Sequence, residues 1–422
     1  MKFSSRRHFF ITFLQTCAVL RLVNAASAVA PAQGNDSSAD LPACALNCIP
    51  APIAERQCGG NTSCWCELDD AMGKAEKCLS SFCSMPVIIT SRKPASVNCH
   101  QAKRDKAPEY LVVNLTLAII TTVIVLSRLL FKRFIGAARK NSPDDWAVLV
   151  AFAVGLPCAF LNHFGLVPNG LGKDAWTLDL ETVSKFAMYF YVLEVLYTAA
   201  VALIKMTFLV FYFSIFTSAS SRRWTRPLLW LAVVFDVLLG IISVCVAAVQ
   251  CVPVSYYWDR YKDESADGHC IPIEPLAWAN GVLSVALDIL IILIPLAEVV
   301  KMQMHWKKKT GVILMFLLGT AVTVISTLRL LSVSGFSSLV NITWEFYGVA
   351  LWSTVEINTG IVCTCLPTIR LILVRISPKV FGSYGSRSGS RLPSSSAGSK
   401  FSRKTSSGTS TVLYPNLEDE DV

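Results

Sequence analysis

The chain has 422 residues, of which 53% are hydrophobic and 16% are charged, and its formal net charge is +9. A soluble globular domain carries about 25% charged residues, so this composition argues against one. It favours a protein with several membrane-spanning helices, whose partner is the lipid bilayer. We attribute the net positive charge to cytoplasmic loops and a cytoplasmic tail, and we predict no nucleic-acid partner.

Residues 1–28 have the features of a secretory signal peptide. Basic residues precede an apolar stretch over 9–20, and Ala25 and Ala28 supply small side chains for cleavage. The alternative interpretation is an additional membrane anchor. A signal peptide would place the region that follows, 30–107, outside the cell.

Seven apolar runs follow that region, at 111–131, 146–166, 186–213, 227–248, 277–300, 311–333 and 349–374. Each run is long enough to cross about 30 Å of hydrocarbon as a helix. Only a helix satisfies the backbone groups of such a run in lipid. We therefore predict an all-α membrane part, a seven-transmembrane helix bundle over 108–375, which follows a small extracellular domain over 30–107.

We predict that the chain lies in the plasma membrane. With the N-terminus outside, an odd number of spans puts the C-terminus in the cytoplasm, and the basic residues of the loops favour this topology. The loops predicted outside carry only Lys173, Lys185, Arg260 and Lys262. The loops predicted inside carry a larger set: Lys132, Arg133, Arg139, Lys140, Arg222, Arg223, Arg226, Lys301, Lys307, Lys308 and Lys309. A group just before the first span runs against this distribution: Arg92, Lys93, Lys103, Arg104 and Lys106.

The last part of the chain, 376–422, is rich in Ser, Gly and Arg and ends in the acidic sequence LEDEDV. It contains too few apolar residues to bury a core. We predict a disordered cytoplasmic tail.

The region before the bundle is rich in cysteine: Cys44, Cys48, Cys58, Cys64, Cys66, Cys78, Cys83 and Cys99. An even number of cysteines in a short secreted segment indicates a disulfide framework, which a domain this small needs for stability. A zinc site is the alternative, but the oxidising side of the membrane and the lack of paired Cys-x-x-Cys ligands oppose it. We predict no metal site.

The cysteine spacing C-x3-C-x9-C-x5-C-x-C-x11-C-x4-C-x15-C, with Pro42 before the first cysteine, resembles the CFEM domain of fungal extracellular proteins. The resemblance implies a compact helical domain that in secreted members holds haem through an aspartate a few residues before the Cys-x-Cys pair. Here the stretch between Cys58 and Cys64 has no aspartate, and Asn61 lies near its place. We therefore predict weak or no haem binding and no cofactor.

Several stretches of the bundle resemble the fungal rhodopsin-like membrane domain: DDWAVLVAF from Asp144, GLGK from Gly170, LEVLYTAAVALIKMTFLVFY from Leu193, QCVPVSYYWD from Gln250, and ALWSTVEINTGIVCTCLP from Ala350. Together with the CFEM pattern, they resemble the CFEM-containing G-protein-coupled receptors of filamentous ascomycetes, the pathogenicity-related class. Two positions depart from that pattern. Ser214 replaces a common arginine at the end of the third span, and Asp174 replaces a common histidine after the Gly-Leu-Gly turn.

Ionisable residues inside the spans are candidates for a ligand pocket or a switch, because each costs at least about 2.5 kcal/mol in hydrocarbon unless it is paired or hydrated. Their positions predict two layers: Glu194, Arg329 and Glu356 nearer the outside, and Lys205, Asp236 and Asp288 at mid-depth or deeper. The alternative is that these pairs only hold helices together. The last span has no lysine, where retinal proteins carry their Schiff-base lysine, so we predict no retinal adduct.

Modifications are predicted at two further kinds of site. Cys251 and Cys270 flank the second outer loop, and we expect them to form a disulfide with each other. Asn-x-Ser/Thr sequons predict glycans at Asn35, Asn61 and Asn341.

These features predict a cell-surface receptor that senses an unknown extracellular ligand and signals to the cytoplasm through a heterotrimeric G protein, in fungal development or host infection. The alternative is a membrane-anchored CFEM binding or adhesion protein without G-protein coupling. The five histidines are scattered along the chain, so we predict no enzyme and in particular no zinc hydrolase. Seven spans do not divide into the repeats of a typical transporter.

Overall fold

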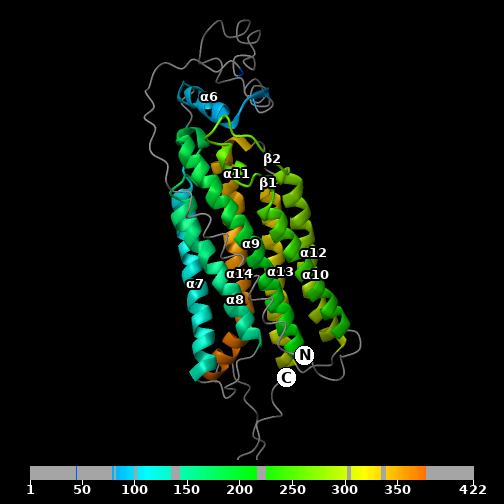
Figure 1. Ribbon diagram of the computed structural model, residues 1–422. Coiled ribbons are helices and arrows are strands. Elements are labelled where there is room, and N and C mark those ends of the chain that lie inside the picture. Colours follow the sequence, from blue (N-terminus) through cyan, green and yellow to red (C-terminus); the bar gives the residue numbers. More distant parts are fainter. Residues whose placement is uncertain are drawn as a thin grey trace, which may run out of the picture. The chain divides into compact units, whose positions relative to one another are not determined.

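The computed structural model describes residues 44, 78–79, 82–98, 102–134, 143–215, 225–301, 306–333 and 339–376. Most of them are helical (Figure 1). The long helices of the bundle are α7 (Ala107–Phe134), α8 (Pro143–Leu161), α9 (Leu180–Ile215), α10 (Thr225–Ala248), α12 (Ile273–Lys301), α13 (Trp306–Val333) and α14 (Ile342–Ile376). The shorter helix α6 (Met85–Asn98) precedes them.

Six of these helices are long and apolar enough to cross a membrane: α7, α8 with its continuation to Leu166, α9, α10, α12 and α14. The seventh, α13, contributes the apolar segment Gly319–Val333. The predicted all-α helix bundle is therefore confirmed, with six helices of spanning length and a shorter apolar segment on α13 among the described residues. Large apolar side chains such as Ile119 on α7 and Ile242 on α10 are exposed, as expected for surfaces that face lipid.

The helices pack in chain order around the bundle, and α9 and α14 lie at its centre. Helix α14 contacts α7, α8, α9 and α13, while α9 contacts α8, α10, α12 and α14. In their most apolar stretches, 44% of α9 and 56% of α14 is buried, against 22% of α7 and of α10. Polar side chains on α9 and α14 are therefore shielded from lipid and meet one another.

One end of the bundle carries a small antiparallel hairpin, and we call this end the hairpin end. Strand β1 (Cys251–Val252) pairs with β2 (His269–Cys270), and a disulfide joins Cys251 to Cys270. Helix α11 (Tyr256–Asp259) belongs to the loop that connects the two strands. The Trp258 carbonyl in this helix accepts a 2.9 Å hydrogen bond from the Ser184 hydroxyl on α9. Burial raises the pKa of Tyr257 well above its ordinary value.

A second structure at the hairpin end joins three parts of the chain, and we call it the 102–106 clasp. The amide of Lys106 donates to the Gly172 carbonyl at 3.1 Å, and the amide of Gly172 donates to the Thr343 carbonyl at 2.9 Å. Gly172 has φ +78°, and an added Cβ would lie 3.0 Å from the Cβ of Lys106, which explains glycine here. The clasp ties the start of α7 to the α8–α9 loop and to the start of α14.

Of the cysteine-rich region, the structure describes Cys44, Cys78 and Cys83. A disulfide joins Cys44 to Cys83, and Cys78 is also disulfide-bonded. The remaining predictions for this part fall outside the described residues: Cys48, Cys58, Cys64, Cys66, Cys99, Asn35, Asn61, the signal peptide 1–28 and the tail from 377.

Candidate functional site

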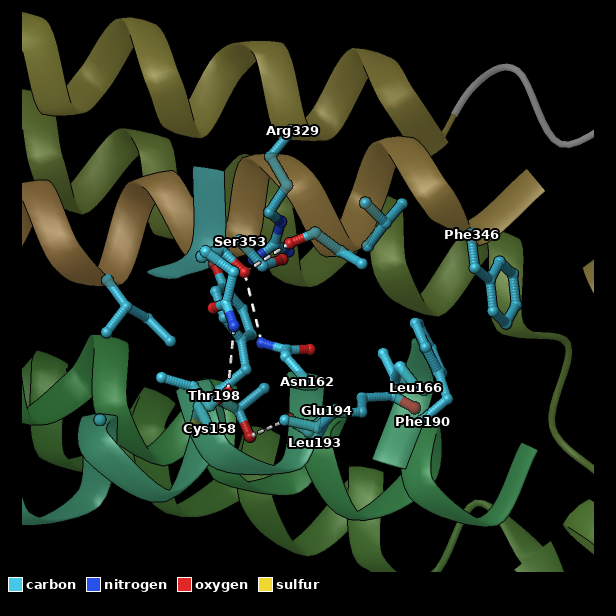
Figure 2. A pocket seen from close by; sticks show the side chains of 18 of the residues that line it. Cys158, Asn162, Leu166, Phe190, Leu193, Glu194, Thr198, Arg329, Phe346 and Ser353 are labelled. Atoms are coloured by element: carbon cyan, nitrogen blue, oxygen red, sulfur yellow. Dashed lines mark hydrogen bonds between the residues drawn. The ribbon is translucent and has the colours of Figure 1, made fainter. Parts of the chain in front are cut away.

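A cavity of about 110 Å³, mostly apolar but with several polar side chains in its wall, lies inside the bundle beside α9, α13 and α14 (Figure 2). The hydrophobic part of its wall includes Leu166, Phe190, Leu193 and Phe346. The polar part includes Asn114, Asn162, Glu194, Tyr197, Thr198, Asn280, Arg329, Ser353, Thr354 and Asn358. A buried water needs only about 10–15 Å³ of such space, so this cavity has room for several waters or a small organic molecule.

Helical periodicity explains how two helices supply most of this wall. The α9 residues Phe190, Leu193, Glu194, Tyr197 and Thr198 follow an i, i+3, i+4, i+7, i+8 pattern and so share one face. The lining residues of α14, from Phe346 to Asn358, follow the same pattern. Each helix therefore presents one face to the cavity, and that face carries both apolar and polar side chains.

The end of α8 changes its winding where it meets the cavity. Residues Asn162–Leu166 form a π-helix, a local widening that is frequent at functional sites. The Asn162 amide donates to the Thr354 hydroxyl at 3.3 Å, and the Tyr110 hydroxyl lies 2.9 Å from the same atom. Thr354 thus links α7, α8 and α14 on one side of the cavity.

Two charged side chains line the cavity, Glu194 from α9 and Arg329 from α13. Nη1 of Arg329 lies 3.7 Å from Oε2 of Glu356, and its guanidinium carbon lies 4.3 Å from the centre of the Tyr197 ring. The Tyr197 hydroxyl donates to Oε2 of Glu356 at 2.6 Å. Glu194 accepts a 3.1 Å hydrogen bond from the Gln250 amide.

A second group of charges lies next to these. Nζ of Lys205 lies 2.8 Å from Oδ1 of Asp288 and donates to the backbone and side-chain oxygens of Ser284 at 2.6 and 2.8 Å. Both charged side chains are more than 90% buried. Asp236 is also buried and lines a smaller cavity with Lys205, but the described residues form no ion pair with it.

A serine joins the two layers that the sequence analysis separates. The Ser326 hydroxyl lies 2.6 Å from Oε1 of Glu356 and 3.2 Å from Oδ2 of Asp288. A hydroxyl has one proton, so it donates to only one of the two carboxylates at a time. Ser326 therefore links the Arg329–Glu356 pair to the Asp288–Lys205 pair. Glu194 lines the main cavity with Arg329, and Asp236 lines the smaller cavity with Lys205. We call these six charged residues the central cluster.

A separate ionic group at the end of the bundle opposite the hairpin was missed by the sequence analysis. Arg128 lies 2.6 Å from Asp144 and 3.0 Å from Asp145, and Lys132 contacts the same two carboxylates at 3.2 and 2.7 Å. Arg128 also donates to the Thr364 carbonyl at 2.7 Å. We call these four charged residues the α7–α8 cluster. The sequence offers one signal for this cluster: Asp144 and Asp145 lie side by side at the start of the second span, and Arg128 lies inside the first span.

The hairpin end corrects the predicted glycan at Asn341. This residue is 6% exposed, its amide nitrogen donates to Asp174 at 2.9 Å, and its amide oxygen accepts from the Ala175 backbone at 2.9 Å. The burial of Asn341 and these two hydrogen bonds oppose a glycan at this position of the folded chain. Asp174, the departure from the histidine pattern, also forms an ion pair with Arg104.

Basic residues that run against the predicted charge distribution have aromatic partners in this region. The Arg92 guanidinium lies 4.7 Å from the Trp176 ring, and Arg104 lies 4.1 Å from the Trp344 ring. The ammonium group of Lys106 lies 4.8 Å from the Trp344 ring. These contacts stabilise the positive charges locally.

Comparison with known proteins identifies the family. The fungal rhodopsin domain matches residues 127–375, more than half of the chain. The chain belongs to the fungal rhodopsin domain family. The CFEM domain matches residues 37–100, so both resemblances found in the sequence are confirmed.

The curated relatives are distant and only partly covered. The chain is 24% identical over 260 residues to Fugralins biosynthesis cluster protein 2 of Gibberella zeae, which covers 61% of this chain and 63% of that protein. It is 22% identical over 264 residues to Receptor GIN3 of Arthrobotrys oligospora, covering 62% of each. It is 24% identical to a SAT4 family membrane protein of Emericella nidulans, covering 48% and 50%. The chain thus spans less than two thirds of each of these relatives, and no solved structure matches it.

Proposed function

We propose that this multi-pass membrane protein is a cell-surface receptor of the plasma membrane, with its CFEM domain outside and its tail in the cytoplasm. It would bind an extracellular ligand in the central cavity and signal through a heterotrimeric G protein, in fungal development or host infection. The proposal includes no enzymatic activity.

The observation that supports this proposal is the continuity between the cavity and the buried charges. Glu194 and Arg329 line the cavity, and Arg329 connects through Glu356 and Ser326 to Asp288 and Lys205. Burying so many ionisable groups is costly, and in membrane proteins such groups mark functional sites. A ligand that changes the contacts of Arg329 would alter hydrogen bonds that reach α12 and α13. The name of one relative, Receptor GIN3, supports the same class.

Capture of a G-protein α subunit tests the coupling. Full-length protein in membranes should retain the α subunit from a fungal extract without nucleotide and release it when a non-hydrolysable GTP analogue is added. A chain that ends at Ile376 serves as the comparison for the tail. Retention that ignores guanine nucleotide, or no retention, would contradict coupling.

A deletion of residues 30–107 separates the receptor from an adhesion protein. A receptor whose ligand site is the cavity should keep nucleotide-sensitive capture, whereas an adhesion protein should lose its surface binding entirely. For orientation, a tag after Val422 should react with antibody only in permeabilised cells. Labelling of intact cells would reverse the proposed topology.

A further inference from the structure

The guanidinium group of Arg329 has unused hydrogen-bonding capacity inside the cavity. It has five N–H donors, yet the described residues accept no hydrogen bond from it. Its nearest carboxylate oxygen lies 3.7 Å away, too far for a hydrogen bond, and that oxygen already accepts a bond from Tyr197. A buried charged donor without acceptors is costly, so this group suits an acceptor that enters the cavity.

Unused acceptors lie on other walls of the same cavity. Oδ1 of Asn114 on α7 is buried and has no hydrogen-bond partner in the part of the chain that the structure describes. Glu194 on α9 lines the cavity, and among the described residues its carboxylate accepts a hydrogen bond from the neutral amide of Gln250 but forms no ion pair. Figure 2 shows Arg329 entering from α13 and Glu194 on the facing helix α9. The cavity therefore offers donors on one side and acceptors on the other.

The charge of the central cluster restricts which ligand fits. The cluster contains the carboxyl groups of Glu194, Asp236, Asp288 and Glu356 but only the cations of Lys205 and Arg329. A ligand that is only an anion would add to this excess of acid. A ligand that is only a cation would leave the donors of Arg329 unbonded and would be repelled by them. A molecule with both charges satisfies both walls and adds no net charge.

We propose that the cavity binds a small zwitterion with an apolar side chain, such as an α-amino acid. Its carboxylate accepts hydrogen bonds from Arg329, its ammonium group donates to Glu194 and to Oδ1 of Asn114, and its side chain packs against Phe190 and Phe346. This assignment rests on the proposed function, because it names the ligand class of the same cavity.

Matched probes test the two charges separately. The purified full-length protein is titrated with L-phenylalanine, with 2-phenylethylamine, which lacks the carboxylate, and with 3-phenylpropionate, which lacks the ammonium group. Each analogue lacks one charged group and the hydrogen bonds that this group makes. We therefore expect L-phenylalanine to bind about tenfold or more tightly than either analogue. L-Leucine is titrated as a second zwitterion. The binding is measured without a G protein, so its failure leaves the coupling experiment unaffected.

Variants assign each charge to its wall. Glu194→Gln should remove the preference for L-phenylalanine over 3-phenylpropionate, and Arg329→Gln should remove the preference over 2-phenylethylamine. If Arg329→Gln does not fold, Arg329→Lys keeps the charge but loses the planar donor pair and should weaken the same preference. The control Glu181→Gln removes an exposed carboxylate at the start of α9 and should change neither preference. Equal binding of all three phenyl probes, unchanged preferences in the variants, or no binding of either amino acid would overturn the proposal.

Discussion

The two buried ionic groups of the bundle differ in how completely their charges are matched. Among the residues that the structure describes, two cations of the α7–α8 cluster face two carboxylates, and each cation contacts both acids within 3.2 Å. In the central cluster, four carboxyl groups share two cations, and one ion pair is as long as 3.7 Å. Matched groups at a helix junction stabilise one arrangement of the helices. Unmatched groups beside a cavity leave capacity for a proton, a ligand or a rearrangement.

The largest expected effect comes from removing the cation at the centre of the matched cluster. Arg128→Met removes the more buried of the two cations from Asp144 and Asp145, together with the hydrogen bond to the Thr364 carbonyl, so the free energy of unfolding should fall by an amount near the upper end of about 3–5 kcal/mol. The melting temperature and the monodisperse fraction of purified protein measure it. Lys132→Met is the matched control with a smaller loss, because its side chain is 33% exposed. Equal behaviour of the two variants would break the comparison.

The ion pair within the central cluster should show the next largest effect. Lys205→Met leaves Asp288 without its cation. The free energy of unfolding should fall by an amount near the lower end of the same range of about 3–5 kcal/mol, which is measured as a lower melting temperature. Adding Asp288→Asn should restore part of the loss, and Asp236→Asn should restore less. Lys185→Met, on the exposed side of the same helix, should have little effect. Equal rescue by the two aspartate changes would refute the specific pairing with Asp288.

Removing one acid from each cluster gives opposite signs, with small magnitudes. Asp145→Asn should lower the free energy of unfolding by about 1–3 kcal/mol, and with it the melting temperature, because it weakens two short ion pairs. Asp236→Asn should leave the melting temperature unchanged or raise it, because it relieves an excess of negative charge. If Asp236→Asn destabilises as much as Asp145→Asn, the central cluster is as well matched as the other one.

Retinal should have no effect at all. Lys205 is held by Asp288 and both oxygens of Ser284, so its amine is not free to form a Schiff base. Incubation with all-trans-retinal should produce no visible absorption band beyond free chromophore. A band that disappears in Lys205→Ala would show that the central cluster holds a chromophore.

The helices and the charged residues of the cavity could be predicted from the sequence, because a spanning helix and a buried charge leave strong local signals. The links between them could not. Depth along a helix follows from residue number, but rotation and side-chain conformation do not, so Ser326 gave no sign that it joins Asp288 to Glu356. Hydroxyl residues are common in helices, and nothing distinguishes this one in the sequence.

The error at Asn341 has a related cause. A sequon is recognised from three residues, whereas its accessibility depends on Asp174 and Ala175, which lie far away in the chain. Arg128 was missed because it lies near the end of its span, where a basic residue ordinarily reaches the membrane surface. Its burial depends on α8 and α14 packing over it, which composition alone does not reveal.

The 102–106 clasp has a mechanical consequence. The chain enters the first spanning helix through a segment that is hydrogen-bonded and bridged to the α8–α9 loop, which in turn is bonded to the start of α14. A force applied to the chain before residue 102 is therefore transmitted to the first turn of α7. Through Gly172 and Thr343 it also reaches α14, the helix whose Phe346 lines the cavity.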